Sequence, residues 1–363
     1  MYNPSGKAGD IIRGEQLLEQ FNCAGCHLLE LPEIRYGANL DDIVATDASV
    51  EFPAAVALLK RLKPPRNGLT GGQHVVKFVG DVEDKTDDKT ETLPVVGFHG
   101  MVVATPNPED DPDDREYVAE LWETLKVGDK ELFPTSKLIF PAAALQEIRP
   151  ARGGQYAEWL ANRLVENKQV KQLSLGQQAS PPPLYLEGIK VQTPWLYNFL
   201  RNPHQIRHTT VLRMPRFNMS NDEARALANY FAAVDNAAYP YQTVPERETQ
   251  YLAAMNAEFH EQHAGKSHDY LTESWKVLNS PLCVKCHAVG GRQPVSTEPA
   301  NDIRAPNLEM AGERLRPDWL LLWLYKSPWI TPYTSMPQNF LPGKKALEEL
   351  FDGDGNAQTQ AVR

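Results

Sequence analysis

The four cysteines of this 363-residue chain fall into two short motifs of the same form. One is Cys23-Ala24-Gly25-Cys26-His27, and the other is Cys283-Val284-Lys285-Cys286-His287. Two thiols three positions apart can each form a thioether bond to a vinyl group of one haem, and the adjacent histidine then lies under the ring, where its imidazole ligates the iron. The motifs therefore predict two covalently bound haem c groups, one on Cys23 and Cys26 and one on Cys283 and Cys286.

Paired cysteines also occur in redox dithiols, zinc sites and disulfides. A redox C-x-x-C does not need a following histidine, and it would have to occur twice by chance. Four thiolates can close one tetrahedral zinc site, but that interpretation leaves both histidines without a role. No cysteine remains outside the two motifs, which suits a chain without disulfides. Haem attachment is the interpretation that uses every residue of both motifs.

A haem iron held by one histidine takes a second axial ligand or keeps an open site. The chain has seven methionines, and two of them precede a proline, in Met214-Pro215 and Met336-Pro337. Met219 follows closely after Met214 and is the alternative ligand in that part of the chain.

An internal repeat links these methionines to the two motifs. Pro182-Pro183-Leu184 corresponds to Pro306-Asn307-Leu308 at an offset of 124 residues. At the same offset the matching pairs are Gly188 and Gly312, Trp195 and Trp319, Leu196 and Leu320, and Leu200 and Leu324. The two methionines match at an offset of 122, which requires a two-residue slip in a loop. Repeats of this kind indicate two copies of one structural unit.

Both copies resemble class I cytochrome c domains, which have a helix, C-x-x-C-H, a Pro-x-Leu segment, a second helix, a Met-Pro loop and a closing helix. The resemblance covers about half of the chain. It implies that His27 and His287 are the proximal iron ligands and that Met214 and Met336 are the distal ligands. It also implies that the carbonyl groups of Pro182 and Pro306 accept hydrogen bonds from the proximal imidazoles. Trp195 and Trp319 are then expected to pack against the haems.

The segment between the first motif and Pro182 is much longer than its counterpart before Pro306, and its pattern differs. Residues 74–79, 93–103, 118–127 and 131–140 are predicted strands, the last two forming a hairpin around Gly128-Asp129. Residues 81–91 and 106–115 are predicted acidic loops, and residues 155–167 a helix. The predicted fold is therefore mainly α, with two class I cytochrome c haem domains and an inserted β-rich module.

The predicted domain boundaries follow from this pattern. The first haem domain is discontinuous, with residues 1–29 and 180–238, and the inserted module spans residues 30–179. Residues 239–265 form a linker, and residues 266–363 form the second haem domain, in which the chain stops at the start of a closing helix.

Short amphipathic helices are predicted to lead into both motifs. Leu17, Leu18 and Phe21 share one helical face before the first motif, and Leu271, Trp275 and Leu278 share one before the second. Ser220-Asn221-Asp222-Glu223 is a capping box that begins the closing helix of the first haem domain, predicted to run through Val234.

Several histidines outside the motifs are weaker candidates. His74 and His99 lie in predicted strands, where a structural role competes with a role as metal ligand or as haem ligand in place of Met214. His260, His263 and His268 lie on or beside a helix in and after the linker. A solvated, histidine-rich linker is the favoured interpretation there, and a metal or haem site is the alternative.

Charge and composition exclude some classes of partner. The formal net charge is −10, so a nucleic-acid partner is not expected, because phosphate requires a basic surface. No apolar run reaches the length of a membrane span. Residues 1–6 lack a signal-peptide pattern. Covalent haem attachment takes place outside the cytoplasm, so the predicted location is periplasmic or otherwise extracytoplasmic, with the signal or anchor absent from this numbering.

Iron with histidine and methionine ligands is six-coordinate and suits electron transfer. The sequence therefore predicts an extracytoplasmic di-haem cytochrome c that transfers electrons between redox partner proteins, among which a membrane respiratory complex is one candidate. The alternative is a di-haem enzyme, peroxidase-like or another small-molecule oxidoreductase, with an exchangeable ligand at the first haem. The two Met-Pro segments favour electron transfer.

Overall fold

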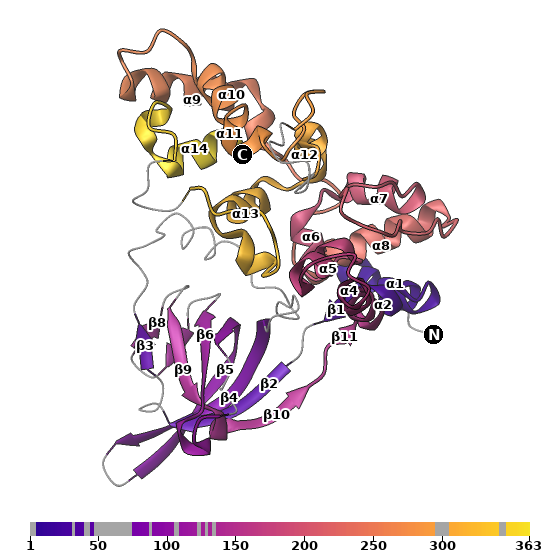
Figure 1. The fold of residues 1–363 in the computed structure, drawn as a ribbon, viewed down its shortest axis with the longest axis vertical. Helices are drawn as coiled ribbons and strands as arrows, with labels where there is room; N and C mark the ends of the chain where they lie inside the picture. Colours follow the sequence, from indigo (N-terminus) through magenta and orange to yellow (C-terminus); the bar gives the residue numbers. More distant parts are fainter. Residues whose placement is uncertain are drawn as a thin grey trace.

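The computed structural model describes residues 5–30, 33–39, 44–46, 75–86, 89–104, 109–121, 125–127, 130–132, 136–294, 305–340 and 346–363. The described chain is mainly helical, as predicted. Every strand in these ranges lies between Leu28 and Gly153, so helical segments precede and follow the strand-forming part of the sequence. Figure 1 shows the sheet at one end of the molecule and the helices at the other.

The larger sheet has seven strands, in the order β10-β2-β4-β5-β6-β9-β3. Its strands are β2 (Glu33–Asn39), β3 (Val44–Thr46), β4 (Val75–Thr86), β5 (Lys89–Ala104), β6 (Glu116–Leu121), β9 (Lys137–Pro141) and β10 (Leu145–Arg149). Strands β2 and β4 are parallel, and the other neighbours are antiparallel. A separate antiparallel pair, β7 (Leu125–Val127) and β8 (Lys130–Leu132), is the inner part of the hairpin predicted around residues 128–129, and β6 and β9 are its outer part.

The acidic loop predicted for residues 81–91 is wrong over most of its length. Strands β4 and β5 continue through it as a hairpin, with Asp81 opposite Pro94 and Thr86 opposite Lys89. Acidic residues are uncommon in strands, but the hydrogen bonds of a β-ladder join backbone groups only, so a hairpin can contain them. In the second predicted loop, the described residues 109–115 contain a short 3-10 helix, η2 (Pro112–Asp114).

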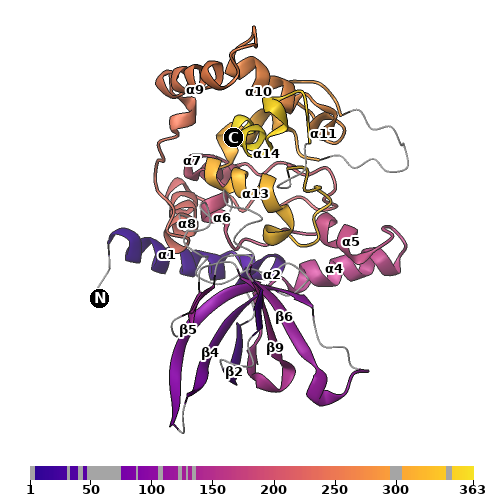
Figure 2. The ribbon, with the colours of Figure 1, turned by 90° about the vertical axis from the view of Figure 1, so that its left-hand side faces the viewer.

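The two ends of the strand-forming segment pair with each other next to the first C-x-x-C-H motif. Strand β1 (Leu28–Glu30) directly follows the motif and pairs with β11 (Arg152–Gly153). Arg152 forms ion pairs with Glu30 at 2.8 Å and with Glu15 at 3.0 Å. Gly153 has φ +86°, and a Cβ atom there would lie 2.4 Å from the carbonyl oxygen of His27, so only glycine fits. The chain thus leaves and re-enters the helical part at one place, with α1 (Gly6–Gln20) and α2 (Cys23–Cys26) at the border of the sheet (Figure 2).

The first helical group contains α1 (Gly6–Gln20), α2 (Cys23–Cys26), α4 (Gln155–Glu166), α5 (Leu173–Ala179), α6 (Glu187–Lys190), α7 (Thr193–Arg201) and α8 (Asn221–Val234). Helix α8 begins at the predicted capping box. The Ser220 hydroxyl accepts a hydrogen bond from the Glu223 N–H at 3.2 Å, and the Glu223 carboxylate accepts one from the Ser220 N–H at 2.8 Å. This satisfies two backbone donors that a helix N-terminus otherwise leaves free.

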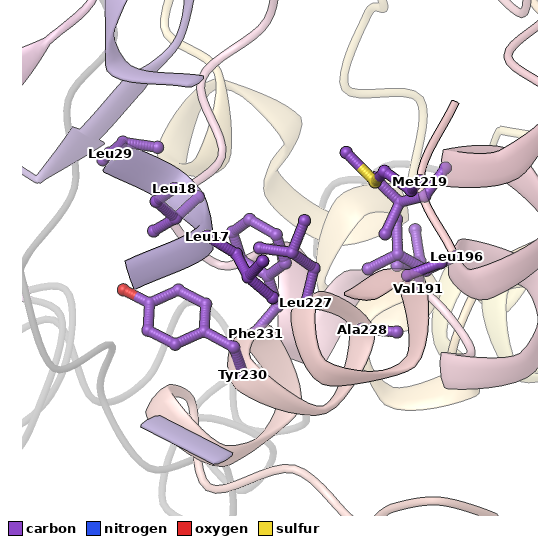
Figure 3. Packing of buried hydrophobic residues seen from close by; sticks show 12 residues of the cluster. Leu17, Leu18, Leu29, Val191, Leu196, Met219, Leu227, Ala228, Tyr230 and Phe231 are labelled. Atoms are coloured by element: carbon purple, nitrogen blue, oxygen red, sulfur yellow. The ribbon is translucent and has the colours of Figure 1, made fainter. Parts of the chain in front are cut away.

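Helices α1 and α8 form the core of this group. Leu17 and Leu18 are buried in one cluster with Leu227 and Phe231 of α8, and Figure 3 shows Leu17 beside these two side chains. The approach is close, because a Cβ atom at Gly14 would lie 2.2 Å from the Cβ atom of Tyr230. The buried face predicted for α1 is confirmed, with Phe21 packed partly buried on the same cluster.

The second helical group contains α9 (Thr249–Gln262), α10 (Tyr270–Leu278), α11 (Pro281–Val284), α12 (Ala311–Arg314), α13 (Pro317–Ile330) and α14 (Gly355–Val362). Helix α14 packs on α10 and α13. A closing helix that packs on the helix before Cys283 was expected after Met336, and α14 occupies that position.

The buried face predicted for α10 is wrong. Leu271 and Trp275 are 53% and 56% exposed, whereas Tyr270, Ser274 and Val277 are buried. The face that contacts α14 includes the buried carboxylate of Glu273, which is bound by Lys266 and His268 and accepts the Phe351 N–H at 3.0 Å. Because these donors neutralise the buried charge, the helix can turn a partly polar face inward.

The two helical groups are joined by residues at equivalent positions of the repeat. Val191 and Leu315, which are 124 residues apart, form an antiparallel bridge. The Gln192 N–H donates to the Arg314 carbonyl at 2.8 Å, and the Arg316 N–H donates to the Lys190 carbonyl at 2.9 Å. The side chains of Gln192 and Arg316 likewise donate to the carbonyl groups of Leu315 and Val191, respectively. An approximate two-fold axis therefore passes between Val191 and Leu315.

Candidate haem-attachment sites

The first C-x-x-C-H motif is a single helical turn. Helix α2 spans both cysteines, and the His27 N–H donates to the Cys23 carbonyl at 2.9 Å. Asn22, in the left-handed region with φ 50°, separates this turn from α1. Cys23 packs against the α1–α8 cluster, while Cys26 is exposed. The turn therefore holds two thiols and an imidazole on a compact backbone beside an apolar core.

The second motif has the same local form in the other helical group. The N–H groups of Cys286 and His287 donate to the Cys283 carbonyl at 3.2 Å and 3.0 Å. The Cys283 thiol lies 3.8 Å from the carbonyl oxygen of Val277, at the buried end of α10. Both cysteines are partly buried.

Each motif histidine contacts a proline carbonyl far away in the sequence. The Nδ1 atom of His27 lies 2.6 Å from the carbonyl oxygen of Pro182, and the Nδ1 atom of His287 lies 2.7 Å from that of Pro306. A carbonyl oxygen only accepts hydrogen bonds, so Nδ1 carries the proton in both rings. This leaves Nε2 of each imidazole with a free lone pair for a metal. The two contacts expected from the resemblance are present.

Both imidazoles are neutral near neutral pH. Burial lowers the pKa of His27 and of His287, and the hydrogen bond to the proline carbonyl opposes this shift without cancelling it. A neutral imidazole is the form that ligates a metal.

The two predicted methionine ligands differ in how firmly they are held. Met336 packs on the apolar cluster around Tyr270 and Val277 of α10. It also takes part in three hydrogen bonds. Trp323 Nε1–H donates to its sulfur at 2.7 Å, Ser327 Oγ–H donates to its carbonyl at 3.1 Å, and its own N–H donates to Thr334 Oγ1 at 3.2 Å. Met214 packs on the α1–α8 cluster with Cys23, and within the described residues no hydrogen bond reaches it. Met214 itself is therefore held by apolar packing, while hydrogen bonds hold the loop before it, such as the one from the Val211 N–H to the Ala179 carbonyl at 3.0 Å.

Met219, the alternative ligand, lies inside the α1–α8 cluster and is 5% exposed (Figure 3). Its surroundings there are the side chains of Val191 and Leu196. This position gives Met219 the role of a core residue, and Met214 remains the better candidate.

The two predicted haem-facing tryptophans each stack on an aromatic ring one helical turn later. Trp195 stacks on Phe199 with ring centroids 5.0 Å apart, and Trp319 stacks on Trp323 at 5.2 Å. Trp319 is 5% exposed, and the guanidinium of Arg314 lies 5.1 Å above the ring of Trp195.

One cysteine of each motif, Cys23 and Cys283, is not activated as a thiolate. Burial raises the pKa of Cys23 to about 11 and raises that of Cys283 as well. Dithiol redox chemistry depends on a lowered thiol pKa, so these values disfavour that alternative. In the part of the chain that the structure describes, no group of three or more His, Cys, Asp or Glu side chains is placed to hold a metal ion.

Among the other candidate histidines, His263 and His268 have structural partners, whereas nothing is described of the side chains of His74 and His99. His74 is outside the described residues, and His99 is described only as a backbone position in β5. His263 is not solvated as predicted: its Nδ1 lies 2.8 Å from Asp352, and its ring packs on Phe259. His268 binds the buried carboxylate of Glu273. These contacts tie the α9–α10 region together.

Sequence reasoning missed three groups that surround the motifs. Phe199 and Trp323 are equivalent in the repeat, and their position four residues after the predicted haem-facing tryptophans was a usable signal. Arg316 joins the two helical groups, with its guanidinium donating to Val191, Thr193, Ala238 and Gln242. In the third group, Lys190 and Arg314 are equivalent in the repeat, but nothing in the sequence links Arg207 to them.

Two further findings bear on the interpretation. Among the described residues, no helix has both the length and the apolar composition that crossing a bilayer requires. Comparison of the chain with protein-family models, with curated proteins and with solved structures gives no match.

Proposed function

We propose that this chain is an extracytoplasmic di-haem cytochrome c that transfers electrons between redox partner proteins. Cys23 and Cys26 hold one haem, and Cys283 and Cys286 hold the other. The observation that carries the proposal is the pair of contacts between the motif imidazoles and the carbonyl groups of Pro182 and Pro306. Two copies of a C-x-x-C-H turn, each with its histidine oriented in the same way by a repeat-equivalent carbonyl, are what two histidine-ligated haems require.

The proposed domain division follows the chain path. Residues 1–29 and 180–238 form the first haem domain, residues 30–179 the inserted β-rich module, residues 239–265 a linker, and residues 266–363 the second haem domain. The pairing of β1 with β11 supports an insertion that begins after the first motif, because an insertion must leave and return at neighbouring points. The strand-forming part returns at Gly153, so α4 and α5 are the helical end of the module and pack with the first helical group.

When bound, each haem supplies one-electron chemistry at its iron. The protein orients the imidazoles through Pro182 and Pro306, and Met214 and Met336 would supply the second ligand of each iron. Burial keeps His27 and His287 neutral, and the hydrogen bonds from their Nδ1 atoms increase the basicity of Nε2. A site filled on both sides by the protein favours electron transfer over binding of a small substrate.

A second candidate function is supported by the contrast between the methionines. Met336 is held by three hydrogen bonds, and Met214 by packing alone within the described residues. An exchangeable ligand at the first haem would make the protein a di-haem oxidoreductase acting on a small molecule, such as a peroxidase-like enzyme.

The test is a haem count per chain, combined with spectra of the ferric and ferrous protein with and without carbon monoxide. Two low-spin haems, both with the charge-transfer band of methionine-ligated iron and neither binding carbon monoxide, are expected. Carbon monoxide binding that persists in a Met336→His variant would assign the open iron to the first site and favour the enzyme. A chain without covalent haem would refute both functions.

A further inference from the structure

Three basic side chains come together where the two helical groups meet. Lys190 ends α6, Arg207 lies in the loop after α7, and Arg314 ends α12 of the other group. Lys190 and Arg314 are also equivalent in the 124-residue repeat, so the approximate two-fold axis brings them to the same region.

The three cations are partly buried, and the backbone segments of Lys190 and Arg314 meet, because the Arg316 N–H donates to the Lys190 carbonyl at 2.9 Å and the Gln192 N–H donates to the Arg314 carbonyl at 2.8 Å. Burial lowers the pKa of Lys190, Arg207 and Arg314, and for Lys190 and Arg314 the neighbouring cations lower it further. Glu187 is the acidic side chain that acts on all three, and its carboxylate lies 2.7 Å from the Lys190 ammonium. One carboxylate does not balance three cations, and an unbalanced charge that is largely withdrawn from solvent is costly.

The hydrogen-bonding capacity of the cluster is also unfilled. Nε of Arg314 is buried and has no hydrogen-bond partner in the described structure, while its guanidinium lies over the ring of Trp195. Arg207 donates to the carbonyl of Ser180 at 3.1 Å. An anion with several oxygen atoms would supply both the missing charge and the missing acceptors.

We propose that Lys190, Arg207 and Arg314 form an anion pocket for the propionate carboxylates of the haem on the first motif. The inference rests on the proposed function. Its position fits, because Arg207 donates to the carbonyl of Ser180, two residues before Pro182, whose own carbonyl contacts His27. Arg314 covers Trp195, the side chain expected against that haem. Arg314 belongs to the second copy of the repeat, so the second helical group completes the cofactor site of the first.

The test uses the full haem-loaded protein and the midpoint potentials of its two haems. Arg314→Gln removes a positive charge that favours the ferrous form, so the potential of the first haem is expected to fall while that of the second is unchanged. Arg314→Lys keeps the charge and should shift the potential less. The matched control is Arg225→Gln, which makes the same charge change on an exposed side chain of α8 that pairs with Asp222. The first haem is assigned as the one whose potential shifts in Met214→His.

Arg207→Gln provides a second approach to the pocket if Arg314→Gln does not fold, and the same selective fall is expected. The measurements are made in chloride and in acetate buffer. A shift seen only in acetate would identify a solvent anion as the occupant and overturn the assignment to propionates. Two bound haems whose potentials are unchanged in both variants would overturn the pocket but leave the proposed function intact, whereas a chain without haem would remove the proposed function itself.

Discussion

The two C-x-x-C-H regions have the same backbone contacts and different side-chain surroundings. In both, the motif is one helical turn and the histidine contacts a proline carbonyl. Yet a Cβ atom at Gly188 would lie 2.0 Å from the carbonyl oxygen of Phe231, whereas at the equivalent Gly312 the nearest atom is Nη2 of Arg247, at 3.8 Å. The two copies of the repeat share the proline carbonyl that orients the proposed iron ligand, but they differ in the packing at equivalent glycines.

Buried carboxylates show the same divergence. Asp235, at the end of α8, accepts a hydrogen bond from the Gly188 N–H at 2.8 Å and has no ion pair in the described structure. Glu273, on α10, is bound by Lys266 and His268. The first region therefore buries a carboxylate against backbone amides, and the second buries one against cations. The two regions are therefore expected to differ in three responses: the stability after substitution of a packed glycine, the stability as the pH changes, and the haem potential after a change beside the proposed methionine ligand.

The largest effect tests whether the two regions bind haem separately. Replacing Cys23 and Cys26 by serine removes the thioether attachment of one haem, and replacing Cys283 and Cys286 removes the other. Each double variant should retain one covalent haem and about half of the Soret absorbance of the parent protein. The measurement is a haem count per chain by pyridine haemochrome assay.

The two double variants serve as controls for each other. Retention of both haems in either variant would contradict the assignment of that motif. Loss of both haems from one variant alone would show that the corresponding region must fold first.

The next effect concerns packing around the repeat-equivalent glycines. In Gly188→Ala the new methyl group collides with the backbone of α8, and overpacking of this kind costs about 1–3 kcal/mol. Gly312→Ala meets no such obstacle, and a change within about 0.5 kcal/mol is expected. Free energies of unfolding from denaturant titration of the haem-loaded proteins check this. Equal destabilisation by the two substitutions would show that the packing difference between the regions does not exist.

The local features that could be predicted from the sequence are those encoded within a few residues. The motifs, the capping box at Ser220, the helix from Gln155 and the strands in β4 and β5 all depend on near neighbours. The histidine–proline contacts were predictable only through the repeat, since His27 and Pro182 are far apart in the chain.

The features that were predicted wrongly or missed have a common physical cause: they depend on contacts between residues that are far apart in the sequence. On α10 the apolar stripe of Leu271 and Trp275 suggested the wrong face, because partners distant in the sequence stabilise Glu273. Alignment on the cysteines would have helped: Val277 precedes Cys283 by the same six positions as Leu17 precedes Cys23, and both are fully buried. The junction through Arg316 could not be foreseen, because its partners come from segments without a shared pattern.

The pH dependence of stability should have opposite signs in the two regions. Burial raises the pKa of Asp235 to about 7, against the hydrogen bonds from Gly188 and Ile189. The contribution of Asp235 to the free energy of unfolding is therefore complete below the ordinary pKa of 3.8, and it is lost as the pH rises toward 7. Burial by itself raises the pKa of Glu273, but Lys266, the Phe351 N–H and His268 outweigh it and together lower this pKa to about 2. Its contribution is present above 4.5 and is lost as the pH falls toward 2.

Two variants separate these effects. Asp235→Asn keeps an acceptor for Gly188 and should raise the melting temperature near pH 8, with little change near pH 4. Glu273→Gln should lower it at neutral pH, with the difference shrinking in acid. The measurement is thermal unfolding across this pH range. The same pH response in both variants would contradict the contrast between the two buried carboxylates.

The smallest expected effect distinguishes the two proposed methionine ligands. Trp323 Nε1–H donates to the sulfur of Met336 at 2.7 Å, whereas the equivalent Phe199 has no donor to offer Met214. A hydrogen bond to the sulfur withdraws electron density that would otherwise stabilise ferric iron, so it raises the potential of the second haem. Trp323→Phe removes a bond worth about 1 kcal/mol and should lower that potential modestly, leaving the first haem unchanged.

The matched control is Trp275→Phe, which makes the same chemical change on an exposed side chain of α10. Spectroelectrochemical titration gives both potentials, and the charge-transfer band of methionine-ligated iron reports whether Met336 remains bound. A fall in the second potential with the band retained would show that Trp323 acts through the sulfur. Loss of the band would show that Trp323 is needed to keep Met336 in place. An unchanged potential with the band intact would show that the Trp323 hydrogen bond does not distinguish the two proposed methionine ligands. Since the donor is present on one side only, this contact by itself raises the potential of the second haem and leaves that of the first unchanged.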